Sequence, residues 1–153
     1  MLQRPSVHGF RFAQAAQTWR GSADISDFAR LAEVLPESRG AIMYQVRGFV
    51  DGERRPCLEV AVETALALVC QRCLGRLHWP LKLGRRLYLA QGEDEAERLE
   101  ADVALVPDAE VLVADAAVDL AALVEDEVLL GLPLIPRHEE GQCPAEAPVT
   151  ELN

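Results

Sequence analysis

Residues 119–143 read DLAALVEDEVLLGLPLIPRHEEGQC, which predicts an amphipathic helix followed by a polar segment. Asp119 can cap this helix, because its carboxylate can accept hydrogen bonds from the unpaired N–H groups of the first turn. Gly131 and Pro133 end it, since glycine tolerates the closing conformation and proline cannot continue a helix. Apolar residues recur between these limits at helical spacing. They are Leu120, Leu123, Val124 and Val128.

Three successive carboxylates, Glu125, Asp126 and Glu127, lie away from the apolar side of this helix. Adjacent helical positions diverge in direction, so the three are not expected to act as a catalytic pair. Because like charges on a helix surface repel each other, a basic partner protein would account for their grouping. We therefore expect them to face outward, either towards solvent or towards such a partner.

The composition indicates one globular domain. The chain has 153 residues, half of them hydrophobic, which is enough to bury a core. A net charge of −10 repels nucleic acid at long range and suits a basic partner protein or simple solubility. The N-terminus does not resemble a signal peptide, and the longest apolar run is too short to span a bilayer. Four cysteines in such a chain predict a reducing, cytoplasmic location.

Alternating apolar and polar residues predict an antiparallel meander between residues 42 and 89. The clearest alternation runs over residues 58–70, and it predicts a long, half-buried strand. A strand over residues 41–50 precedes it and a returning strand over residues 77–83 follows it. Pro80 places the returning strand at an edge, because proline has no N–H to donate to a neighbour.

The rest of the chain completes an α+β fold, in which one antiparallel sheet has two helices packed on one face. The first helix starts at Ser22 or Asp24 and ends at Pro36. The remaining expectations are an N-terminal arm over residues 1–21, a mobile acidic loop over 91–102 with at most a fraying helical turn, short strands over 103–106 and 111–113, and a flexible tail over 144–153.

Cys70 and Cys73 form a Cys-x-x-Cys turn between two predicted strands. Two thiolates at this spacing can bind one zinc ion, because the turn points both sulfur atoms inward. A complete site needs two more ligands, and His138 and Cys143 follow the helix in a polar segment able to fold back over the turn. Cys57 and His78 are spare candidates.

Two other interpretations of these residues remain open. In the first, Cys70 is the buried end of a strand, Cys73 is a turn residue and His138 is a loop histidine bonded to backbone. In the second, the pair is a thiol oxidoreductase motif. That chemistry favours a cysteine at a helix N-terminus, whereas this pair lies between strands.

The segment between Thr64 and Gly92 contains no acidic residue, so the predicted hairpin is basic on an acidic protein. Such a hairpin can contact RNA phosphates, or its basic residues can simply be solvated. The candidate RNA-binding residues are Arg72, Arg76, Lys82, Arg85 and Arg86.

The motifs at residues 70–73 and 124–136, followed by His138 and Cys143, resemble those of the bacterial YceD family, the large ribosomal RNA subunit accumulation proteins. The resemblance implies a single YceD-like domain over residues 1–143. It also implies a cytoplasmic factor for the accumulation, processing or stability of large-subunit ribosomal RNA, with a link to large-subunit ribosomal proteins. It implies no known reaction.

Two functions of different classes follow. The first is a non-enzymatic ribosome biogenesis factor that binds a large-subunit ribosomal protein, ribosomal RNA or both. The second is a zinc- or thiol-dependent enzyme that uses Cys70 and Cys73. We favour the first, because the sequence contains no recognisable nucleophile with its base.

Overall fold

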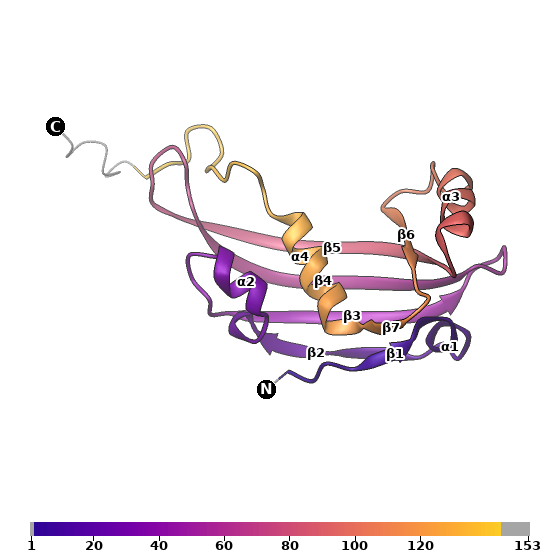
Figure 1. The fold of residues 1–153 in the computed structure, drawn as a ribbon. Coiled ribbons are helices and arrows are strands. Elements are labelled where there is room, and N and C mark those ends of the chain that lie inside the picture. Colours follow the sequence, from indigo (N-terminus) through magenta and orange to yellow (C-terminus); the bar gives the residue numbers. More distant parts are fainter. Residues whose placement is uncertain (1, 145–153) are drawn as a thin grey trace.

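A computed structural model describes residues 2–144 and contains a five-stranded sheet in the order β2-β3-β4-β5-β6 (Figure 1). The long central strands β3, β4 and β5 follow one another in the chain, as expected of a meander. The five strands are β2 (Thr18–Asp24), β3 (Ala41–Val50), β4 (Pro56–Val69), β5 (Arg76–Ala90) and β6 (Ala109–Val113).

The predicted strand pairing is confirmed. Strand β4 pairs antiparallel with β3, where Val60 lies opposite Val46, and with β5, where Leu66 lies opposite Trp79. Strand β6 departs from the all-antiparallel expectation, because it pairs parallel with residues 86–90 of β5. It does not reach Pro80, so that part of β5 is an outer strand, as the proline indicated.

The helices α2 (Ala29–Val34) and α4 (Leu120–Gly131) lie on the same face of the sheet (Figure 1), which confirms the α+β class. We call this the covered face. A third helix, α1 (Gly9–Gln14), also packs there. It approaches so closely that a Cβ atom on Gly48 would lie 2.6 Å from the carbonyl oxygen of Phe12. The core thus lies between one sheet face and three helices.

The N-terminal third differs from the expectation. Strand β1 (Ser6–His8) pairs antiparallel with β7 (Ala117–Asp119), and β2 occupies part of the predicted arm and helix. The first helix is therefore shorter than predicted. Asp24 caps a single 3-10 turn, Ile25–Asp27, and Phe28 is extended before α2 begins.

The acidic stretch predicted as a mobile loop is the helix α3 (Glu93–Asp102), so that prediction is wrong. Three acidic residues in its first turn favour the helix, because they face the positive end of its dipole. The strand predicted over residues 103–106 is also wrong, since these residues form turns. Val103 instead joins Cys57 and Tyr88 in a small apolar cluster beside α3.

Residues 132–144 lead from the end of α4 to the turn between β4 and β5. There the N–H of Gln71 donates to the carbonyl oxygen of Pro136 at 2.8 Å. The predicted flexible tail over residues 144–153 lies outside the described residues, apart from Pro144. No helix within residues 2–144 has the length and apolar character needed to cross a membrane.

Candidate functional site

The Cys70–Cys73 pair lies in a tight turn between two strands, as predicted. The N–H of Cys70 donates to the carbonyl oxygen of Gly75 at 2.9 Å, and the N–H of Leu74 donates to that of Cys70 at 2.8 Å. Leu74 has a φ of 62°, which lets the chain reverse direction between the strands. The turn buries both cysteines at the end of the hairpin.

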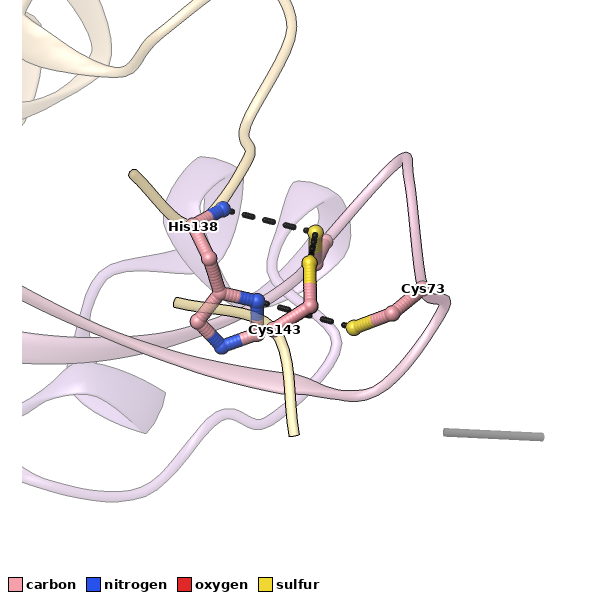
Figure 2. Close-up of side chains that lie close together, drawn as sticks. Cys73, His138 and Cys143 are labelled. Carbon is pink, nitrogen blue, oxygen red and sulfur yellow. Dashed lines mark hydrogen bonds between the residues drawn. The ribbon is translucent and has the colours of Figure 1, made fainter. Parts of the chain in front are cut away.

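His138 and Cys143 fold back over this turn and complete a Cys3His cluster (Figure 2). The Sγ atoms of Cys70 and Cys143 are 3.9 Å apart, and the Sγ atom of Cys73 is 3.5 Å from Nδ1 of His138. All four potential ligand atoms lie within 4.8 Å of one another. Ligands of one tetrahedral zinc ion are separated by roughly 3.3–3.8 Å. The cluster that the sequence predicted is therefore present, and it is compatible with zinc binding.

The spare candidates Cys57 and His78 lie elsewhere. The thiol of Cys57 contacts the carbonyl oxygen of Arg55 at 3.2 Å, within the apolar cluster beside α3. His78 is exposed on β5, opposite Ala67. Among the described residues, neither side chain belongs to the cluster of potential metal ligands.

Backbone N–H groups make the environment of Cys70 favourable for a thiolate. The N–H groups of Arg72 and His138 both donate to its Sγ atom at 3.4 Å. Burial opposes ionisation, but these N–H groups, that of Cys73 and the His138 side chain outweigh it and lower the pKa of Cys70 to about 5. A thiolate is the form of cysteine that binds metal ions.

Cys73 behaves in the opposite way. The N–H of Gly75 favours its thiolate, but burial and the neighbouring sulfur atoms of Cys70 and Cys143 together raise its pKa. Several thiolates in one small space repel one another, so the cluster favours a divalent cation that neutralises them together.

Arg72 helps to hold the loop that carries the later ligands. Its guanidinium donates to the backbone carbonyl oxygens of His138 and Glu139. Gly141 has a φ of 78° and Gln142 donates its N–H to the carbonyl oxygen of Glu139, which turns the chain back so that Cys143 reaches the cluster. Arg72, which sequence reasoning assigned to RNA, thus has a structural role at this site.

The expectation that Glu125 and Glu127 face outward is wrong. Their exposed fractions are 3% and 4%. Glu125 accepts hydrogen bonds from the backbone N–H groups of Arg30 and Leu31, at 2.7 and 3.1 Å, and pairs with the Arg30 side chain. Because α2 has no side-chain cap of its own, Glu125 supplies the missing acceptor for its first turn.

Glu127 is also engaged, since it forms an ion pair with Arg85. Burial raises the pKa of Glu127 although Arg85 opposes the shift. Asp126 is the most exposed of the three carboxylates, and it pairs with Arg30 at 2.7 Å. The carboxylates of α4 therefore join elements of the fold, since Glu125 and Asp126 reach Arg30 of α2 and Glu127 reaches Arg85 of β5.

The five basic hairpin residues do not form one patch. Residues of β5 alternate between the two faces of the sheet, so Arg85 points to the covered face, towards Glu127 and Glu110. Lys82 and Arg86 point to the opposite face. Arg76 pairs with Glu37 at 2.9 Å near the turn.

Sequence reasoning missed two basic residues that share a face with Lys82 and Arg86, namely Arg20 and Arg47. Arg47 lies in a correctly predicted strand, and the strand register would have placed it in one row with Arg86. Arg20 was missed because β2 has only two large or apolar residues on its inner side, Trp19 and Ala23, so its alternation is weak.

A family model described as "Large ribosomal RNA subunit accumulation protein YceD" matches residues 58–153. The matched range contains all four members of the Cys3His cluster and the whole of α4. Comparisons with curated proteins and with solved structures gave no match.

Proposed function

Because the chain belongs to the YceD family of large ribosomal RNA subunit accumulation proteins, we propose that it acts as a non-enzymatic ribosome biogenesis factor. In this proposal it promotes synthesis, processing or stability of large-subunit (23S) ribosomal RNA in the cytoplasm. It does so by binding a large-subunit ribosomal protein, ribosomal RNA or both. The observation that carries the proposal is the family match over residues 58–153.

The Cys3His cluster has a structural role in this proposal. Cys70, Cys73, His138 and Cys143 would hold one zinc ion, which attaches the segment after α4 to the turn between β4 and β5. Four protein ligands close a tetrahedral site, whereas catalytic zinc sites keep a position for water or substrate. The closed ligand set therefore favours a zinc ion that stabilises a surface over one that performs a reaction.

The alternative is a zinc- or thiol-dependent enzyme acting through Cys70 and Cys73. Both cysteines are buried, with exposed fractions of 0% and 6%, and Cys70 follows a strand rather than beginning a helix. Reactive cysteines of oxidoreductases are usually accessible and often lie at helix N-termini. These features weigh against the alternative.

Native mass spectrometry of the purified full chain, before and after treatment with a chelator, separates a zinc-bound cluster from the free thiols that a thiol-dependent enzyme needs. The proposal expects one zinc ion per chain, lost with chelator, and no bound zinc in a Cys73→Ser variant. A Cys57→Ser variant is the matched control and should keep its zinc. A zinc-free chain whose Cys70 and Cys73 cycle between dithiol and disulfide would instead support the enzyme.

The cellular function is tested by depleting the chain from its host and measuring 23S ribosomal RNA relative to 16S ribosomal RNA. Depletion should lower this ratio, and the wild-type chain should restore it. Proteins and RNA captured by the tagged chain, identified separately, would name the partner. An unchanged ratio after complete depletion would contradict the proposed function.

A further inference from the structure

The face of the sheet opposite α2 and α4 is exposed over the middle of strands β2 to β5. Side chains on this uncovered face come from alternate positions of each strand, as the strand register requires. Three successive rows of paired residues cross it. They are Thr18, Arg47, Glu59 and Arg86; Arg20, Gln45, Ala61 and Gly84; and Ser22, Met43, Glu63 and Lys82.

These rows are basic on a strongly acidic protein. They contain four basic side chains, those of Arg20, Arg47, Lys82 and Arg86, but only two acidic ones, Glu59 and Glu63. The whole chain carries a net charge of −10. These three rows therefore have a local charge opposite in sign to that of the molecule, which suits an anionic partner.

Two of the arginines are held in place. The guanidinium carbon of Arg47 lies 4.6 Å from the ring centroid of Phe49, and that of Arg86 lies 5.1 Å from the same centroid. Arg47 also pairs with Glu59 at 2.9 Å. Because both guanidiniums share one phenyl ring, less side-chain entropy is lost when they bind a ligand.

The middle row is hollow over β4 and β5, because its residues there, Ala61 and Gly84, are small. Ala61 lies opposite Gly84, and two depressions of about 300 and 520 Å³ both include Ala61 in their walls. Alternate residues of a strand are separated by roughly 6.8 Å, so the hollow lies between the paired arginines on one side and Lys82 on the other. This shape leaves room for a ligand between the arginine pair and Lys82.

We propose that this uncovered face binds single-stranded RNA, an inference that rests on the proposed function and assigns its RNA contact to a surface. Guanidinium groups bind phosphate through paired N–H donors, and their planes stack on unpaired bases. The hollow accepts one strand between the arginine pair and Lys82. Met43, 56% exposed, is the only large apolar side chain exposed in the three rows, which offers little for a protein partner.

The turn of the hairpin is the competing surface. Arg72 and Arg137 line a depression there, together with His138 and Trp79. However, Arg72 already donates to backbone carbonyl oxygens, and Arg76 is paired with Glu37. The uncovered face is favoured because Arg20 and Lys82 are exposed and point to the same side of the sheet as the arginine pair.

The test measures binding of the full chain to a labelled oligouridine of about 12 nucleotides, at several salt concentrations. The variant Arg20→Glu/Lys82→Glu should bind at least about 10-fold more weakly near 0.1 M salt. The slope of log binding constant against log salt concentration should be shallower by about 1.4. The matched control Arg11→Glu/Arg39→Glu changes the net charge equally at exposed positions outside the three rows. It should bind within about 3-fold of the wild type, since it alters only long-range repulsion.

A second variant should gain affinity for RNA, and misfolding cannot explain a gain in binding. Glu63→Lys replaces an acidic residue beside Lys82, and we expect it to bind RNA several-fold more tightly than the wild type. Glu33→Lys on α2 is the matched control with the same change of charge at an exposed position. It should change binding less than Glu63→Lys does.

Four results would overturn this inference, and three of them concern the surface itself. They are equal losses in the Arg20/Lys82 and Arg11/Arg39 variants, loss only in an Arg72→Glu/Arg137→Glu variant, or capture of a ribosomal protein in place of RNA through this face. A wild-type chain that binds no RNA at low salt yet restores 23S ribosomal RNA in depleted cells would also overturn it. In that case the proposed function would stand, with a protein as the direct partner.

Discussion

Helix α4 and the segment that follows it are consecutive in the chain, yet they are held to the protein in different ways. The helix buries residues on several sides, including Leu120, Val124 and Val128, which are fully buried. In the segment over residues 132–144, by contrast, Leu134 and Ile135 are 98% and 62% exposed. Polar contacts and the Cys3His cluster, rather than apolar burial, position most of this segment.

The difference shows that apolar packing in the fold holds α4, whereas the Cys3His cluster and a few polar contacts hold the segment over residues 132–144. Burial of apolar surface holds α4 whether or not a metal ion is bound. The later segment carries two of four potential metal ligands that come together at one point. Metal binding at such a site contributes directly to the stability of the structure around it. The two regions should therefore respond differently when the cluster or the helix is altered.

The largest effect is expected when zinc is removed from the cluster or when Cys73 is changed to serine. The amide of Gln71, which donates to Pro136, should lose its protection from hydrogen exchange, because the segment over residues 132–144 detaches. The amides of α4 should stay protected. Hydrogen exchange with mass spectrometry on the zinc-loaded and chelator-treated chains measures both.

Cys57→Ser is the control for this prediction, since Cys57 lies in the separate apolar cluster beside α3. If α4 and the later segment lost protection together, the two regions would form one cooperative unit and the proposed contrast would be wrong.

The next largest effect concerns Glu125. Glu125→Ala should lower the free energy of unfolding by about 3 kcal/mol, because it leaves Arg30 without its buried partner and the first N–H groups of α2 without an acceptor. Asp126→Ala should cost less than about 0.5 kcal/mol, since Asp126 is partly exposed. Urea denaturation at neutral pH measures both values, and equal values would contradict the structural role of Glu125.

A smaller effect distinguishes two buried cysteines in the metal-free chain. The pKa of Cys70 is lowered to about 5 by N–H donors that outweigh burial, whereas burial raises that of Cys57 to about 11. At pH 7 the Cys70 thiol should therefore react with iodoacetamide before that of Cys57 does. Peptide mass mapping of the alkylated chain gives the order. Prior alkylation of Cys57 would show that the N–H groups around Cys70 do not set its acidity.

The smallest effect concerns Glu127, whose pKa in the folded chain lies above the usual 4.5. Folding therefore disfavours its ionised form. The wild type should lose stability relative to Glu127→Gln as the pH rises from below 4.5 through the raised pKa. Thermal unfolding of both chains across this pH range measures the difference. A wild type that gains stability over the same range would show that the pair with Arg85 outweighs burial.

The sequence predicted the elements whose signals are local. Alternation over residues 58–70 and the short turn at Cys70–Cys73 predicted β4 and its pairing with β5, and the capped, periodic stretch after Asp119 predicted α4. The Cys3His cluster was predictable because the Cys-x-x-Cys turn supplies two potential zinc ligands, and His138 and Cys143 follow in a polar segment able to fold back over it.

Long-range contacts explain what the sequence did not predict. Three adjacent carboxylates have the pattern of a solvated face. Glu125 is buried because Arg30 and α2, which lie far from it in the sequence, pack against it. The acidic segment before Val103 resembled a loop because its helix depends on dipole effects and on a small cluster with Cys57. Arg20 lies on the uncovered face because β2 pairs with β3, a contact between strands that the sequence did not predict.

The pairing of β1 with β7 has a consequence for how the chain folds as it is synthesised. Ser6 lies opposite Asp119, and the N–H of Leu120 donates to the carbonyl oxygen of Pro5. The β4–β5 hairpin closes a short loop and can form early, but β1 has no strand partner until β7 emerges from the ribosome. Residues 6–8 are therefore among the last to reach their final place, and until then the nascent chain presents β1 as an unpaired strand.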